Sequence, residues 1–501
     1  MSKRKDQTPD LGGDITKAIF DLGEILIVKA MEVSVTGLIL LWNHVLVPFV
    51  GKKLLPSLFK RRRVPPPKKI ERRELRTRKA TLKDDHLGYS VSQRRPIELI
   101  DLDRRRHTMI CGASGFGKSV LLDVLMYDDM RKGKPVIFID PKGDRGSLKQ
   151  FINLARLARR KFQVFSESYD AHGAIALNPA KEGRFTHIAD RIHYAFNWSE
   201  EHYETLCYRA LKTASRKVLE EKKTPSFENI LERLESGDFE RKNIEGLISR
   251  LENIVHSDFG GRLAESGLSL KEVWEGGQCV YIGLPVLGLP MAARALGKMI
   301  LGDLSYAVYD AYRKERADLR GSVGVYMDEL SAVITDEFIE LLNKCRAAKM
   351  ELTFAFQCPN DINKINPHLC EQILENSSNW FIFKQRVNAG ADLFAQAIGT
   401  AEGVKQTVRV SRGEEQDQGS QRRVEELIAH HNIIKNLRTG QTVLLRHSPT
   451  EVDLVNVKYI DPKIVRFNIG ERIKEGSIPP LDIEVKKNVP SPKNESIWDE
   501  V

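Results

Sequence analysis

The residues Gly112–Ser119, with the sequence GASGFGKS, have the types and spacing of a loop that binds phosphate groups. Glycines in such a loop let backbone N–H groups turn inward and approach phosphate oxygens without Cβ clashes. Lys118 is expected to reach the β- and γ-phosphates of a nucleotide, and the Ser119 hydroxyl is expected to ligate Mg²⁺. The residues predicted to contact the nucleotide are Gly112, Ala113, Ser114, Gly115, Phe116, Gly117, Lys118, Ser119 and Val120.

The elements predicted around this loop are the ones that its chemistry requires. A short apolar strand is predicted at 107–111, directly before the loop, and a helix with a buried apolar face at 120–127. A strand, a glycine-rich loop and a helix in this order are the context of a P-loop. The helix N-terminus adds partial positive charge beside the phosphates. This context disfavours the alternative, a glycine-rich turn without catalytic meaning.

A carboxylate for the metal is predicted at the end of a second apolar strand, Gly324–Glu329 (GVYMDE). Asp328 is placed to hold Mg²⁺ through water, and Glu329 is placed to polarise the attacking water. Many strands end in acidic residues, so the pair predicts a metal site only because the chain also contains a P-loop. Together the two motifs favour an ATP hydrolase with ATP and Mg²⁺ as cofactors, rather than a kinase or a switch.

Three more apolar strands, at 136–139, 279–284 and 352–356, complete a predicted parallel sheet, because helical stretches lie between them. The first of these strands ends in DPKGD (Asp140–Asp144), a tight polar loop on the side of the sheet where ligands bind. The last ends in Gln357, which we expect to face the γ-phosphate as a sensor. The alternative for Gln357 is an ordinary loop residue after a strand.

Composition limits what the rest of the chain does. The 501 residues provide room for two or three domains. The net charge of +10 is no evidence for nucleic-acid binding, because Lys52–Lys79 alone holds thirteen Lys and Arg against two Glu, a local charge of +11. The cysteines form no C-x-x-C pair, which argues against a disulfide framework or a zinc site and for reduced thiols in a cytoplasmic domain. They are Cys111, Cys207, Cys279, Cys345, Cys358 and Cys370.

A membrane anchor is predicted near the N-terminus. Residues 33–50 include no Asp, Glu, Lys or Arg over eighteen positions, the lower limit for spanning a bilayer core of about 30 Å. The basic run that follows, from Lys52 to Arg63, marks that side as cytoplasmic. The apolar stretch 18–30 contains three charged residues, which favours an interfacial helix or a helix paired with a partner. The alternative for 33–50 is a buried helix of a soluble domain.

Taken in order, the motifs HTMICGASGFGKS, VIFIDPKGD, YMDEL, LLNKCRAAK and LTFAFQ resemble the type IV secretion coupling proteins. These are the TraG/TraD-like ATPases of conjugation, within the HerA/FtsK superfamily. The resemblance extends from about His86 to Ile460, roughly three quarters of the chain. It implies a homo-hexameric ring with ATP at subunit interfaces, which brings a relaxase-bound single strand of DNA to the channel proteins of the secretion system. It also implies the bacterial inner membrane as the location, with the ATPase domain in the cytoplasm.

The resemblance further implies an arginine supplied by the neighbouring subunit, and the matching position is Arg346 in LLNKCRAAK. The alternative is a solvated cation on a helix, and Arg386 is a weaker candidate for the same role. An all-α domain is implied at 186–270, where helices are predicted at 203–222 and 227–235. Its basic cluster either contacts DNA or is a solvated helix face. The cluster consists of Lys212, Arg216, Lys217, Lys222 and Lys223.

The predicted fold class is α/β, a RecA-like P-loop NTPase domain with an inserted all-α domain and an N-terminal membrane anchor. The ATPase domain is expected at 86–185 and 271–470, with a strand at 406–410 and a polar loop at 413–421. The flanking and inserted regions are the anchor at 1–57, a basic proline-containing linker at 58–85, the all-α domain at 186–270 and a disordered tail at 471–501.

The favoured function is therefore a membrane-anchored ATPase that couples hydrolysis to DNA transfer in conjugation. One alternative is a motor of the same superfamily with another cargo, either a coupling ATPase for protein effectors or a pump for double-stranded DNA in segregation. A second alternative is a membrane scaffold whose assembly is controlled by nucleotide without motor activity. The acidic pair and Arg346 argue against the scaffold, because a scaffold does not need catalytic groups.

Overall fold

The computed structural model describes residues 86–460, except for 92, 314–320 and 412–413 and, for side chains, 406–420. The chain divides into two units, residues 1–66 and 67–501, and all of the described residues belong to the second. The predicted span at 33–50, the linker at 58–85 and the tail at 471–501 lie outside the described residues. Within the described part, no helix is both long and apolar enough to cross a membrane.

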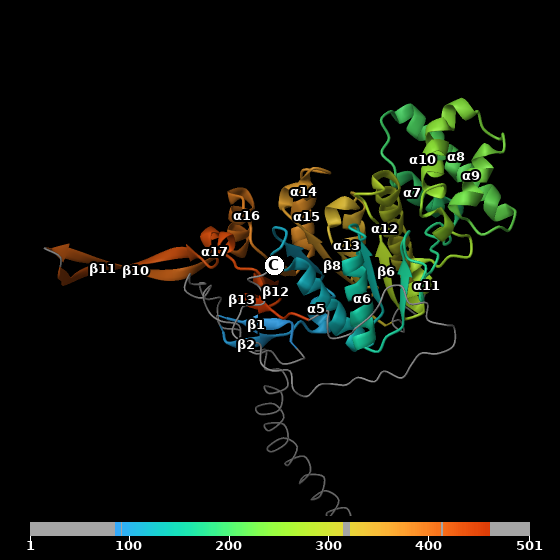
Figure 1. Ribbon diagram of the computed structural model, residues 1–501. Coiled ribbons are helices and arrows are strands. Elements are labelled where there is room, and N and C mark those ends of the chain that lie inside the picture. The colour runs from blue at the N-terminus through green and yellow to red at the C-terminus, as the bar shows by residue number, and fades with distance from the viewer. Residues whose placement is uncertain (1–85, 92, 314–320, 412–413, 461–501) are drawn as a thin grey trace, which may run out of the picture. The chain divides into compact units, whose positions relative to one another are not determined.

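Eleven strands of the described chain form one sheet, in the order β2-β1-β13-β12-β9-β3-β8-β7-β4-β6-β5 (Figure 1). All neighbours from β9 to β5 are parallel, and β12, β13, β1 and β2 extend the sheet with antiparallel pairs. The parallel strands are β3 (Thr108–Cys111), β4 (Val136–Asp140), β5 (Phe162–Phe165), β6 (Cys279–Gly283), β7 (Val323–Met327), β8 (Met350–Phe356) and β9 (Asn379–Ile382). The antiparallel strands are β1 (Gly88–Ser90), β2 (Arg95–Ile97), β12 (Gln441–His447) and β13 (Thr450–Val457).

Helices cover both faces of the parallel strands, and successive strand residues alternate between the two cores. Ile110 and Phe138 pack with α5 (Lys118–Arg131) and α6 (Arg145–Leu157), whereas Met109 and Ile137 pack with the helices of the opposite face. Burial on both faces explains why these strands are continuous apolar runs rather than alternating patterns. The helices of the opposite face include α12 (Pro290–Arg313), α13 (Phe338–Cys345), α15 (Leu369–Asn376) and α16 (Asn388–Ile398).

Between β5 and β6 the described chain is mainly helical, and α8, α9 and α10 pack on one another (Figure 1). Helices α7 and α10 contact α12, which joins this region to the core of the sheet. The helices here are α7 (Phe185–Tyr194), α8 (Glu201–Glu220), α9 (Phe227–Glu235), α10 (Arg241–Val255), η4 (Gly260–Arg262) and α11 (Leu270–Glu275). The remaining short helices are α4 (Asp101–Arg104), η6 (Leu330–Ala332), α14 (Pro359–Asn363) and α17 (His431–Lys435).

A separate two-stranded antiparallel ribbon, β10 (Thr400–Ser411) and β11 (Glu414–Leu427), lies between α16 and α17 in the sequence (Figure 1). The strand predicted at 406–410 is confirmed, but the polar loop predicted at 413–421 is wrong, because most of that stretch belongs to β11. Polar residues form this ribbon because the ladder of backbone hydrogen bonds does not require an apolar side chain.

Candidate functional site

The P-loop follows the carboxyl end of β3 and is held from three sides by backbone hydrogen bonds. Gly112 N–H donates to Phe356 O (3.2 Å), Ala113 N–H donates to Lys384 O (2.9 Å), and Phe116 O accepts from Gly440 N–H (3.0 Å). A Cβ on Gly112 would lie 2.5 Å from the Cβ of Phe383, so a side chain is excluded there. The loop is therefore held by the last residue of β8, by Lys384 after β9 and by Gly440 before β12.

The turn into α5 depends on a left-handed residue. Gly117 has φ 107°, which only glycine adopts readily, and α5 begins at the next residue, Lys118. The helix starts two residues earlier than the sequence predicted. Lys118 Nζ donates to Gly112 O (2.6 Å) and to Ala113 O (3.3 Å), so its ammonium lies over the loop where phosphates are expected. Burial lowers the pKa of Lys118, an effect that Asp328 and Glu329 partly oppose.

Asp328 follows the carboxyl end of β7 and is buried, with 1% of its surface exposed. Its Oδ2 accepts from Ser119 Oγ (3.1 Å) and from Lys142 Nζ (2.6 Å). Its Oδ1 is buried and has no hydrogen-bond partner among the residues that the structure describes. A buried carboxylate oxygen without a partner is costly. The carboxylate and the Ser119 hydroxyl are oxygen ligands of the kind that Mg²⁺ takes, so the residues present fit a magnesium nucleotide.

Glu329 has a left-handed backbone, with φ 63°, at the turn into η6. Its Oε2 accepts from Gln357 Nε2 (3.0 Å) and its Oε1 accepts from Ser331 Oγ (3.0 Å). Gln357 reaches Glu329 because β8 lies between β3 and β7, so the residue after β8 emerges between the P-loop and the acidic pair. Five of the predicted residues thus surround one site: Lys118, Ser119, Asp328, Glu329 and Gln357.

Lys142 is the residue that sequence reasoning missed. The DPKGD loop was predicted to lie on the ligand side of the sheet, but no motif indicated that its lysine would pair with the metal carboxylate. Burial opposes the charge of Lys142, but Asp328 outweighs that effect and raises its pKa. In the same loop, burial raises the pKa of Asp140 to about 6, although its carboxylate accepts a hydrogen bond from Tyr281 Oη (2.8 Å).

A cavity of about 160 Å³ opens beside Ser119 and Asp328, between α5 and α6. Burial raises the pKa of Asp123 in its wall to about 8, and the negative charge of Asp328 adds to that shift. The wall is lined by Ser119, Leu122, Asp123, Phe138, Gly146, Ser147, Gln150 and Asp328. The predicted metal ligands therefore face a space large enough for water molecules.

Two predicted arginines lie in different places. Arg346 is exposed after the carboxyl end of α13, and it is close enough to His107, at the amino end of β3, to help lower the pKa of that ring. It therefore lies at the edge of the sheet opposite the P-loop of its own chain. Arg386 is exposed beside the P-loop, with its guanidinium carbon 5.8 Å from the centroid of the Phe116 ring.

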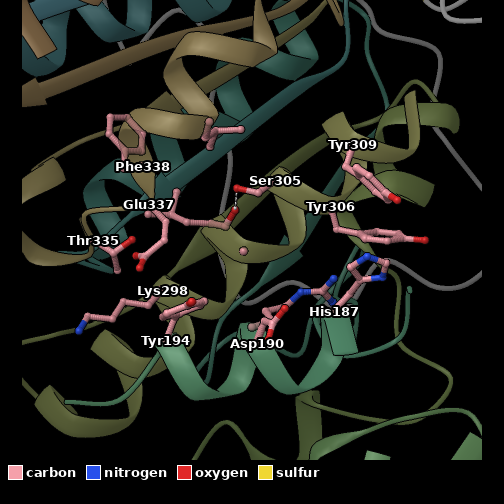
Figure 2. Close-up of a pocket in the computed structure, with 14 residues that line it drawn as sticks. His187, Asp190, Tyr194, Lys298, Ser305, Tyr306, Tyr309, Thr335, Glu337 and Phe338 are labelled. Carbon is pink, nitrogen blue, oxygen red and sulfur yellow. Dashed lines mark hydrogen bonds between the residues drawn. The ribbon is translucent and has the colours of Figure 1, made fainter. Parts of the chain in front are cut away.

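A larger cavity, of about 340 Å³, lies between α7, α12 and the start of α13 and shares no residue with the P-loop site (Figure 2). His187, Tyr306 and Tyr309 gather on one side, with ring centroids 5.2–6.0 Å apart. Three of its charged groups are engaged: Asp190 accepts from Tyr208 Oη (2.6 Å), Arg191 donates to the carbonyl of Pro179, and Lys298 donates to Asn197 Oδ1 (3.1 Å). The cavity is larger than the one at Asp328 but lacks a comparable set of convergent, unpaired groups.

The predicted basic cluster on α8 is partly occupied by contacts within the chain. Lys217 Nζ pairs with Asp238 (2.7 Å), and the guanidinium carbon of Arg216 lies 4.4 Å from the centroid of the Phe185 ring. Lys212 lies over the Tyr208 ring at 5.4 Å. These contacts favour the solvated helix face over the DNA contact.

Two domain families match the chain. Residues 86–272 match the central domain of the helicase HerA, and residues 322–437 match the family described as the TraM recognition site of TraD and TraG. The chain matches no curated protein sequence.

Solved structures of the bacterial conjugative coupling protein TrwB resemble the fold. A trigonal form with sulphate is 15% identical, with a TM-score of 0.57 over 81% of this chain and 94% of that one. A complex of TrwB with ADP and Mg²⁺ is 16% identical, with a TM-score of 0.54 over 78% and 92% of the two chains. These likenesses confirm the predicted RecA-like α/β fold. With the two domain families, they also confirm the predicted resemblance to TraG/TraD-like coupling ATPases.

Proposed function

We propose that this chain is an ATP hydrolase that couples turnover to the transfer of DNA, as a relaxase-bound single strand, through a type IV secretion system. The observation that carries the proposal is the placement of Asp328 and Glu329 around Lys118 and Ser119, with Gln357 bonded to Glu329 at 3.0 Å. A nucleotide-binding scaffold needs the loop and the lysine but does not need a second carboxylate held by a sensor residue.

In the proposed reaction, the N-terminus of α5 and Lys118 bind the phosphates; Ser119 would ligate Mg²⁺, and Asp328 would hold it through water. The metal, when bound, neutralises charge that develops on the phosphate oxygens. Glu329 polarises the attacking water and accepts its proton. Gln357 and Ser331 orient Glu329 through the two hydrogen bonds to its carboxylate, so the base faces the nucleotide rather than solvent.

We further propose that the active form is a homo-hexamer in which Arg346 completes the site of a neighbouring subunit. Arg346 lies at the amino edge of the parallel strands, whereas the P-loop lies at the carboxyl edge. An exposed arginine at that edge can therefore serve only the P-loop of another copy. Arg386, beside Phe116, is placed to act within its own subunit.

The proposed cargo and location rest on the family matches. The matched family at 322–437 is named for TraM recognition by TraD and TraG, and the structural relatives are conjugative coupling proteins. We propose that residues 1–57 anchor the chain in the bacterial inner membrane, that 58–85 form a linker, and that 186–270 form an all-α domain inserted into the ATPase domain. The relaxosome and the channel proteins are the proposed partners.

The test is ATP turnover by the purified chain without DNA, with single-stranded DNA and with duplex DNA. We expect single-stranded DNA to stimulate turnover, and we expect Lys118→Ala and Glu329→Gln to abolish it. Arg346→Ala should lose turnover alone but regain part of it when mixed with Lys118→Ala subunits, because a mixed ring contains sites with both groups intact. Lys344→Ala, which removes an exposed lysine two residues away on α13, is the matched control.

The possible outcomes distinguish the alternative functions. Stimulation by duplex DNA alone would favour a segregation pump, and turnover that ignores DNA in an assembled ring would favour a coupling ATPase for protein effectors. Assembly that depends on nucleotide, without ATP turnover, would favour the membrane scaffold. The acidic pair favours the first two over the third, because Glu329 and Gln357 have no role in assembly alone.

A further inference from the structure

The ammonium group of Lys142 occupies the place where the metal site needs a cation. Lys142 Nζ lies 2.6 Å from Asp328 Oδ2, the oxygen that also accepts from Ser119 Oγ at 3.1 Å. Ser119 and Asp328 are the two residues proposed to hold Mg²⁺. A lysine bonded to that oxygen therefore competes with the hydrated metal for Asp328, because the ammonium and a metal-bound water cannot both use the oxygen freely.

Asp328 needs a counter-charge when no metal is bound. Its side chain is 2% exposed, and an ionised carboxylate at that depth is costly unless a cation or several donors compensate it. Lys142 supplies the cation, and its own side chain remains 45% exposed. The lysine can therefore leave Asp328 for solvent at little cost, whereas the carboxylate cannot follow it.

The backbone beneath Lys142 is held in place, so only its side chain is free to move. Its N–H donates to Asp140 Oδ1 (3.0 Å), and the preceding carbonyl, of Pro141, accepts from Val286 N–H (3.0 Å). A Cβ on the next residue, Gly143, would lie 2.9 Å from Pro285. The loop is thus packed against the β6–α12 connection. The side chain of Lys142 can change its rotamer while its backbone stays in place.

Resting on the proposed function, we propose that Lys142 is an exchangeable counter-ion of Asp328, which Mg²⁺ displaces when the metal nucleotide binds. The exchange keeps the carboxylate neutralised in both states. It also makes the chain discriminate against metal alone, because a divalent cation must break a charge-assisted hydrogen bond before it reaches Asp328. The nucleotide phosphates supply the remaining attraction that completes the exchange.

The exchange has a second consequence. Lys142 Nζ is bonded to the Asp328 oxygen that also accepts from Ser119 Oγ, and Ser119 is next to Lys118, so the ammonium lies near the phosphate-binding start of α5. After displacement, the Lys142 ammonium remains at the mouth of a site that holds phosphate charge. A triphosphate offers it more negative charge than a diphosphate does. We therefore expect Lys142 to favour the triphosphate, as a positioning residue that acts after Asp328 has released it.

The experiment compares the full-length chain with Lys142→Met, which removes the charge at nearly constant length, and with Lys142→Arg, which keeps the charge. Lys149→Met removes an exposed lysine from the neighbouring helix α6 and controls for net charge. The first readout is Mn²⁺ binding without nucleotide, followed by electron paramagnetic resonance. The second is the affinity for fluorescent ATPγS and ADP in Mg²⁺. Thermal melts report whether each variant is folded.

We expect Lys142→Met to bind Mn²⁺ at least about tenfold more tightly than the native chain, because a hydrogen bond to a charged group no longer has to be broken. The preference of this variant for ATPγS over ADP should fall, whereas Lys142→Arg and Lys149→Met should match the native chain in both readouts. Unchanged Mn²⁺ affinity in a folded Lys142→Met would overturn the inference. Failure of the native chain to bind nucleotide would instead overturn the proposed function, since the Mn²⁺ readout does not depend on nucleotide.

Discussion

Charged side chains gather at both edges of the parallel strands, but the two groups differ in whether their charges are already matched. At the amino edge, Arg104 pairs with Asp129 (2.8 Å) and Lys134 pairs with Glu351 (2.9 Å). Arg104, Asp129 and Glu351 are all fully buried, and Tyr326 Oη also donates to Asp129. At the carboxyl edge, the partner of Asp328 is Lys142, whose side chain is half exposed and can be replaced by a ligand.

The charged groups at the two edges have different roles, one structural and the other in ligand binding. The amino-edge network joins α4, α5, β7 and β8; α5 begins at the P-loop, and β7 ends at the acidic pair. Its carboxylates are paired with cations that are themselves buried, so it fixes the relative positions of these elements. The carboxyl-edge charges have partners that a ligand can replace. Similar residue types therefore serve architecture at one edge and exchange at the other.

The largest effect on ATP turnover is expected for Arg346, which lies at the amino edge but does not belong to the buried network. Replacement by alanine should lower ATP turnover about 10³-fold, the lower end for an arginine supplied across an interface. The free energy of unfolding should change by less than about 0.5 kcal/mol, since the side chain is exposed. Turnover and chemical denaturation of the same preparation test both values. Unchanged turnover would make Arg346 a solvated cation at the end of α13, and a large loss of stability would instead give it a structural role within its own subunit.

The second effect compares two aspartates of the same size. Asp129→Asn leaves Arg104 buried without its counter-charge and should reduce the free energy of unfolding by about 3–5 kcal/mol. Asp328→Asn should cost less than about 1 kcal/mol, because its partner Lys142 can turn to solvent, yet it should lose Mg²⁺-dependent nucleotide binding. Urea titrations give the stabilities, and nucleotide titrations with and without Mg²⁺ give the binding. Equal stability losses would remove the contrast between the two edges.

The third effect concerns the orientation of Glu329. Gln357→Ala removes the hydrogen bond to Oε2 and should lower turnover about 10²-fold, the scale of general acid–base catalysis. Nucleotide affinity should stay within about twofold, because Gln357 is proposed to act only after binding. Ser331→Ala removes the hydrogen bond to Oε1 from the same turn and should have a smaller effect, since η6 still holds the backbone. If Gln357→Ala weakened binding and left turnover at saturation unchanged, the sensor role would be wrong.

The sequence predicted the carboxyl edge better than the amino edge. The loop that contains Lys118 and Ser119 follows β3 directly, and Asp328 and Glu329 follow β7 directly. Parallel strands bring their carboxyl ends to one edge, so local patterns sufficed there. Lys142 was missed because its partner lies 186 residues away, and no spacing rule connects a loop lysine with a carboxylate on another strand.

The amino-edge network was missed for a related reason. A buried Arg104 or Glu351 has the same appearance in sequence as an exposed one, and only the packing of four elements shows that each charge is matched. Part of β11 was mistaken for a loop, because residues 414–421 (EEQDQGSQ) are all polar or glycine and show no alternation of apolar residues.

The smallest effect is a pH dependence of opposite sign at the two edges. Burial, assisted by Arg346, lowers the pKa of His107 to about 4, whereas burial raises the pKa of Asp140 to about 6. The unfolded chain binds more protons at His107 between about pH 4 and 6.5, so this residue should cost about 2 kcal/mol of stability between pH 7 and pH 5. Asp140 has the opposite effect on stability, because its folded form takes up a proton more readily as the pH falls through about 6.

His107→Asn suits the left-handed backbone, with φ 63°, and offers Leu352 N–H an oxygen in place of Nδ1. The stability gap between the native chain and His107→Asn, measured by urea titration, should therefore narrow from pH 7 to pH 5, and a gap that stays constant would contradict a neutral, buried His107.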